Sequence, residues 1–120
     1  MANTPTKPSS QNIARIWRGR TKPDKANEYA KYLLDHGVRK LESLGARGVQ
    51  MFREDREADS YFMVISYWDT RQAMTQWAGE DPNKIRHLER DPELLMEVPA
   101  SVQILDVCSN NWFLTDAMRN

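Results

Sequence analysis

Cysteine and histidine are scarce in this sequence. Its 120 residues include one cysteine, Cys108, and two histidines, His36 and His87. A single cysteine cannot form an internal disulfide, and these counts exclude a zinc site built from four cysteine or histidine ligands. A chain of this length can bury a sizeable core without such cross-links. We therefore expect a domain that is stabilised by apolar packing and that resides in a reducing compartment, the cytoplasm.

An excess of charge of one sign is also absent. The 17 lysine and arginine residues balance 17 aspartate and glutamate residues, so the formal net charge is zero. Because binding to a phosphate backbone needs a positive excess, we do not expect nucleic acid as a partner. The mean hydropathy is -0.74, and no run approaches the roughly 18 apolar residues of a transmembrane helix. A membrane partner is therefore not expected either.

Motifs with a fixed catalytic spacing are missing as well. The chain has no GxGxxG, no phosphate-binding GKS or GKT, no HExxH and no catalytic spacing of cysteine and histidine. The sequence therefore offers neither a phosphate loop nor a metal triad, and we expect no metal site built from its own side chains.

Hydrophobic patterning predicts four strands. Apolar residues alternate with a two-residue period, or fill both alternate sets, in four segments. These segments are 13–20, 49–53, 61–68 and 101–108. The third, YFMVISYW, is apolar on both faces and is expected at the centre of a sheet. Cys108, which ends the last segment, is expected to be a buried small hydrophobe.

Helical spacing predicts two helical regions between these strands. A long amphipathic helix is expected over 23–44, since apolar residues recur there three and four positions apart. Asp69 and Gln72 have the spacing of a capping box, which predicts a second helix that starts after Asp69. A further short helix over 83–90 is expected to stop at Asp91-Pro92.

The predicted order strand, helix, strand, strand, helix, strand is that of a ferredoxin-like α+β fold, a four-stranded antiparallel sheet with its helices on one face. Residues 1–11 are expected to form a disordered arm, 12–108 the domain and 109–120 a C-terminal tail. The strands 13–20 and 61–68 are apolar on both faces, so the face away from the helices must also be covered. A second copy of the chain is the simplest cover.

We therefore expect a homodimer in which two sheets pack face to face. Ile13, Trp17 and Tyr61 are among the residues expected in its interface, although the sequence does not decide which alternate set of each strand faces the helices. Trp112 and Phe113 make the tail too apolar for a free end, so we expect the tail to pack on the dimer.

Three stretches of this chain resemble one known family. They are IARIWRGRT at the start, YWDTRQAMTQWAGEDP in the middle and ASVQILDV near the end. They resemble the antibiotic biosynthesis monooxygenase (ABM) domain of the dimeric α/β-barrel superfamily, over about residues 13–107. The resemblance implies a dimeric α/β barrel. It also implies monooxygenase activity, in one branch on aromatic polyketides without metal or flavin and in another on haem.

The resemblance to these two branches is carried by particular residues. The haem-degrading branch has a tryptophan at the end of the second helix and, ten residues later, a histidine that ligates the haem iron; Trp77 and His87 have this spacing. This implies haem as an alternative cofactor, with His87 as its axial ligand. The asparagine in the first strand of that branch falls at about Ile16. In the polyketide-oxidising branch, a tryptophan that ends the third strand matches Trp68, and a tyrosine six residues later falls on Met74.

Physical reasoning singles out Arg15, because an arginine among apolar strand residues needs an anionic partner, either an ion pair or a ligand. Neighbouring strands bring aromatic residues close enough to line a pocket, in which Arg15 would hold a phenolate or carboxylate and Tyr67 would donate a hydrogen bond. The predicted catalytic residues are His87, Arg15 and Tyr67, and the predicted pocket residues are Trp17, Trp68, Trp77 and Met74. Packing in the core or in the dimer interface is the alternative role for each aromatic residue.

Three functions remain open at this point. The first is a cofactor-independent monooxygenase that acts on a small aromatic or otherwise oxidisable metabolite, since an ionised substrate can itself pass an electron to oxygen when the protein stabilises the anion. The second is a haem-binding or haem-degrading monooxygenase that uses His87 and Trp77. The third is a ligand-binding dimer without enzymatic activity.

Overall fold

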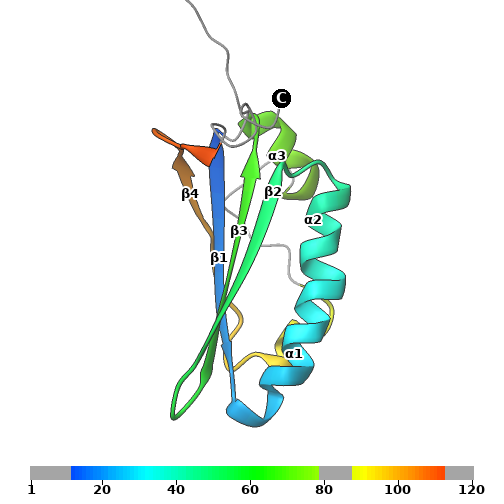
Figure 1. Ribbon diagram of the computed structural model, residues 1–120. Coiled ribbons are helices and arrows are strands. Elements are labelled where there is room, and N and C mark those ends of the chain that lie inside the picture. Colours follow the sequence, from blue (N-terminus) through cyan, green and yellow to red (C-terminus); the bar gives the residue numbers. More distant parts are fainter. Residues whose placement is uncertain (1–11, 79–87, 113–120) are drawn as a thin grey trace, which may run out of the picture.

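A single antiparallel sheet organises the molecule (Figure 1). The computed structural model describes residues 12–78 and 88–112, and the predicted arm lies outside these residues. The strands are β1 (Ile13–Thr21), β2 (Gly48–Asp55), β3 (Ser60–Trp68) and β4 (Gln103–Asp106), in the order β2-β3-β1-β4. Each predicted strand is present, and the predicted ferredoxin-like α+β fold is confirmed.

The helices lie on one side of the sheet (Figure 1). Between β1 and β2 the chain forms η1 (Pro23–Lys25), α1 (Ala26–Tyr32), the π-helical η2 (Leu33–Val38) and α2 (Arg39–Ser43). The helix α3 (Arg71–Ala78) follows β3, and the short α4 (Asp91–Leu94) precedes β4. The predicted long helix thus exists, but it contains a π-helical segment. None of the described helices is long and apolar enough to cross a membrane.

The predicted start of the second helix was wrong by one residue. The backbone N–H of Ala73 donates to Oγ1 of Thr70 at 3.1 Å, so Thr70 rather than Asp69 caps α3, while Asp69 pairs with Arg47 at 3.4 Å. Asp91 and Pro92 form the first turn of the short helix α4. Proline suits the first turn of a helix because its missing N–H would have no partner there. The helix predicted over 83–90 lies mostly outside the described residues.

Strand register decides which residues face the helices. Alternate residues of β3 are buried on the helix side, and they are Phe62, Val64, Ser66 and Trp68. Ile13 pairs with Trp68 and Trp17 with Val64, so Ile13 and Trp17 belong to the same core. Their expected place in a dimer interface was therefore wrong. Tyr61 has the opposite alternation and lies on the outer face of the sheet.

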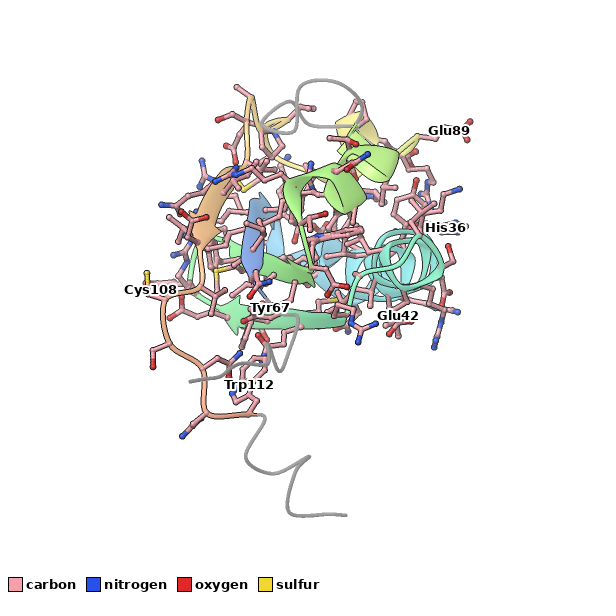
Figure 2. The ribbon with its side chains drawn as sticks, turned by 90° about the horizontal axis from the view of Figure 1, so that it is seen from above. His36, Glu42, Tyr67, Glu89, Cys108 and Trp112 are labelled. Carbon is pink, nitrogen blue, oxygen red and sulfur yellow. The ribbon has the colours of Figure 1, made fainter. Side chains whose placement is uncertain are left out.

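The outer face of the sheet carries apolar residues and the beginning of the tail. Residues 109–112 form a hollow together with Ala14, Ile16 and Ile65. Trp112 packs edge-on against Tyr67, with ring centroids 5.1 Å apart (Figure 2). The described part of the tail therefore packs on its own subunit. Cys108 is exposed beyond the end of β4, contrary to the expected burial.

Candidate functional site

A small cavity lies between the helix side of the sheet and the helices. Its lining is mainly aromatic and aliphatic, and its polar side chains besides Tyr29 are Arg15, Ser66 and Asp91. The complete lining consists of Arg15, Trp17, Tyr29, Leu33, Gly37, Leu41, Val64, Ser66, Leu88 and Asp91. The centres of water-sized molecules can occupy a volume of about 40 Å³ in this cavity. One water molecule needs roughly 10–15 Å³, so the cavity has room for more than one. We call this the helix-side cavity. A concave apolar site with few polar groups is typical of small-molecule binding.

Arg15 contributes the positive charge of the cavity. It lies on β1, between Ser66 of β3 and Ile104 of β4, and only 4% of its surface is exposed. Its Nε and Nη2 atoms are buried and have no hydrogen-bond partner among the described residues. Burial lowers the pKa of the guanidinium to about 10, because desolvation disfavours the charged form. A buried cation with two unpaired donors destabilises the folded state, and an anionic ligand would offset that destabilisation.

A buried tyrosine and a buried carboxylate in the same cavity lining join two elements of the fold. The Tyr29 hydroxyl on α1 donates to Oδ1 of Asp91 at 2.9 Å, and Oδ2 of Asp91 accepts from the Leu88 N–H at 3.0 Å. Burial and the neighbouring Asp91 raise the pKa of Tyr29 far above its usual range, so the phenol stays neutral. These bonds fix Leu88 and Asp91 in the cavity wall against α1.

A π-helical segment shapes the wall next to them. Gly37 lies in η2 and lines the helix-side cavity. A Cβ atom at this position would lie 3.0 Å from Cδ1 of Leu33 and 3.6 Å from Cδ1 of Leu88. The missing side chain therefore leaves part of the cavity open, and π-helical segments often accompany functional sites. The adjacent His36 is exposed on the outside of the helix (Figure 2). Its ring centroid lies 4.8 Å from that of Tyr32.

The structure brings only some of the predicted site residues together. Arg15 and Trp17 line the helix-side cavity, and Trp17 stacks on Tyr29 with centroids 6.4 Å apart. Trp68 and Met74 are fully buried in the same core but do not line the cavity, although the Trp68 Nε1–H donates to the lining Ser66 at 2.9 Å.

Tyr67 lies on the other face of the sheet. Its hydroxyl donates to Oε1 of Gln50 at 2.9 Å, and burial raises its pKa. The predicted pairing of Arg15 with Tyr67 in one pocket is therefore wrong for this cavity. Trp77 belongs to α3, but its side chain and the whole of His87 lie outside the described part of the structure.

Three residues of the cavity could not be identified as site residues from the sequence pattern. Tyr29 belongs to the apolar stripe of the first helix, which is indistinguishable from ordinary core. Asp91 resembled a helix stop, since it precedes a proline. Gly37 was the one signal available, because a glycine within an otherwise regular helical pattern often marks close packing or function.

The fold and this site define a class of protein, a ferredoxin-like α+β domain with a small, mainly apolar cavity under its helices. The family model described as antibiotic biosynthesis monooxygenase (ABM) matches residues 13–84, which is more than half of the 120 residues. The chain belongs to this ABM family. No curated protein matches it.

Solved structures share the fold. A putative antibiotic biosynthesis monooxygenase from Bacillus cereus is 15% identical, with a TM-score of 0.57 over 83% of this chain and 96% of that one. A haem-degrading protein from Mycobacterium tuberculosis, with two haems bound in its active site, is 19% identical. Its TM-score is 0.51 over 82% of this chain and 97% of its own. At these identities the likeness concerns the fold alone.

Proposed function

We propose that this protein is a monooxygenase of the ABM type, which oxidises a small aromatic or otherwise oxidisable metabolite in the helix-side cavity without a cofactor. Membership of the ABM family supports the class of reaction. The single observation that supports the site is Arg15, a buried cation that faces an apolar cavity without a partner among the described residues.

This arrangement suits a substrate that reacts as an anion. Oxidation of a methylene group to a carbonyl by dioxygen consumes one O₂, places one oxygen atom in the product and releases the other as water. The substrate first loses a proton, and the resulting anion passes electrons to oxygen. The protein needs to exclude water and stabilise the anion, which a buried guanidinium in an apolar cavity can do.

Oxygen uptake tests this function. Purified protein is incubated with phenols, hydroquinols and enolisable ketones, each small enough for one ring, while dioxygen is followed with an electrode. We expect uptake above the buffer rate with at least one compound, with a product that carries one atom from ¹⁸O₂. Binding of such compounds without any uptake would favour the non-enzymatic ligand-binding dimer.

Haem is the alternative cofactor. The side chain of Trp77 and the whole of His87, which would contact haem, lie outside the described residues. The helix-side cavity that the described residues enclose is far smaller than a porphyrin. The helix-side cavity formed by the described residues therefore does not fit haem. A haemin titration followed in the Soret region tests this: we expect no saturable shift, whereas a shift of one haem per chain that is lost in His87→Ala would favour haem.

We also propose a homodimer that forms through the outer face of the sheet. Phe52 and Leu105 lie on this face and are half-exposed, and the partly exposed Ile65 lies beside them, whereas Ile16 on the same face is already buried within its own chain. An exposed apolar sheet face of this kind is typical of an interface. A cytoplasmic location stays a prediction from the sequence.

A further inference from the structure

We propose that the ligand of the helix-side cavity carries a carboxylate, which Arg15 binds through Nε–H and Nη2–H together. This inference rests on the proposed function only in taking that cavity as the ligand site. It goes further because it selects one chemical group and one edge of one side chain.

The first support is the pair of atoms left unused. Nε and Nη2 lie along the same edge of a guanidinium, and their N–H bonds are nearly parallel. Two parallel donors match the two oxygens of a carboxylate, which is the geometry of bidentate arginine recognition. Both atoms are buried and without a partner among the described residues. The unpaired Nε–H and Nη2–H groups thus form the complete guanidinium edge that binds a carboxylate, not a single unpaired donor.

The second support is charge. A water molecule could accept hydrogen bonds from this edge, but it would leave the buried positive charge uncompensated, whereas a carboxylate compensates the charge as well. The carboxylate already in the lining, Asp91, is not available because Tyr29 and Leu88 donate to its two oxygens. The Nε and Nη2 donors of Arg15 therefore have no bond to Asp91 or to any other described residue. No described residue of this chain thus supplies an anionic partner for Arg15.

The third support is the size and chemistry of the walls. Trp17 and Tyr29 present aromatic surface, and Leu33, Leu41 and Val64 present aliphatic surface. The volume of about 40 Å³ for water centres corresponds to a few water molecules, so the ligand must be small and the wall side chains must move to admit it. A small, planar, largely apolar acid satisfies both the walls and the guanidinium edge. A hydrated inorganic anion satisfies only the guanidinium.

Calorimetric titration with benzoate tests the proposal. We expect benzoate to bind with one site per chain, and the neutral isostere benzamide and inorganic phosphate to bind at least about tenfold more weakly, as expected when a charged hydrogen-bond pair is lost. Arg15→Gln should abolish the preference for benzoate over benzamide. Arg15→Lys keeps the charge but loses the parallel donors, so it should recover only part of the preference. Circular dichroism confirms that each variant is folded.

Arg18→Gln is the matched control. Arg18 lies three residues along the same strand, is exposed and pairs with Met63 on the outer face, so its loss should leave benzoate binding unchanged. The proposal would be overturned if benzamide or phosphate bound as tightly as benzoate. It would also be overturned if a folded Arg15→Gln variant bound benzoate with the native affinity.

The oxygen electrode separates this inference from the proposed function. Oxygen uptake with neutral phenols but without any binding of benzoate would overturn the proposed carboxylate recognition and leave the proposed oxygenase function standing. Arg15-dependent binding of benzoate with no uptake on any hydroxylated aromatic acid would leave the carboxylate site intact and contradict the oxygenase.

Discussion

At the scale of single residues, the unusual feature is a buried charge that no described residue of the fold compensates. Arg15 lies on a central strand, is buried, and has no acidic partner among the described residues. Its pKa of about 10 reflects the loss of water around the guanidinium. Buried charges without partners reduce stability, and they are found where a binding site requires them.

Replacement of Arg15 by methionine is therefore expected to stabilise the free protein. Methionine fills similar space without a charge to desolvate, so the free energy of unfolding should rise by about 1–3 kcal/mol while benzoate binding is lost. Urea denaturation with and without benzoate measures both effects. A loss of stability in Arg15→Met would show that the guanidinium supports the fold, contrary to its assignment as a ligand-binding group.

Asp59 illustrates the opposite case, a charge that the fold does use. It is buried at the turn between β2 and β3, and it accepts from Arg56 Nε at 2.7 Å and from Arg20 Nη1 at 2.9 Å. The hydrogen bonds from Arg56 and then Arg20 lower the pKa of its carboxyl. This contribution is present above the unfolded-state pKa and is lost as the pH falls through the lowered pKa.

Asp59→Asn should therefore be less stable than the native protein at neutral pH, and the difference should shrink as the solution is acidified. Thermal unfolding midpoints between about pH 7 and about pH 2.5 measure this convergence. The exposed Asp24→Asn serves as the control and should follow the native curve. A gap for Asp59→Asn that stays constant down to the lowest pH would contradict the ionic role of Asp59.

At the scale of elements, the strands and helices followed from periodicity, but their orientation did not. Residues of β1 are apolar in both alternate sets, so the sequence could not tell that Ile13 and Trp17 face the helices while Ile16 faces outward. The π-helical turn and the Tyr29 to Asp91 hydrogen bond depend on tertiary packing, which a local pattern does not contain. Arg15 could be predicted because a charge among apolar strand residues is a local signal.

Gly37→Ala tests the role of the π-helical segment. The new methyl group would approach Leu33 and Leu88 and fill part of the cavity wall. Alanine favours helix by about 1 kcal/mol over glycine, so stability should change by no more than about that amount while benzoate binding weakens. Calorimetry and urea denaturation on the same protein separate the two quantities. Unchanged binding in Gly37→Ala would place the ligand away from η2.

At the scale of the whole molecule, the proposed dimer accounts for apolar surface that one chain leaves exposed. Leu105 on β4 is 44% exposed, so it adds little to the core of its own subunit. Sedimentation at micromolar concentration should give a particle of about twice 14.0 kDa. Leu105→Asp should shift it toward the monomer, because burial of a carboxylate in an apolar interface is unfavourable.

Leu34→Asp is the matched control for this surface. Leu34 is 37% exposed but lies on η2, on the opposite side of the sheet, so its replacement should leave the dimer intact. A native protein that sediments as a monomer, or a Leu105→Asp variant that stays dimeric, would contradict the assignment of the outer face.

The most direct test of Arg15 as the centre of the functional site is the rate of substrate-dependent oxygen uptake in three proteins: native, Arg15→Gln and Arg18→Gln. With the best hydroxylated aromatic compound, we expect Arg18→Gln to match the native rate and Arg15→Gln to lose about a hundredfold or more, as for the loss of an anion-stabilising donor. A native rate in folded Arg15→Gln would contradict the assignment of the helix-side cavity as the active site.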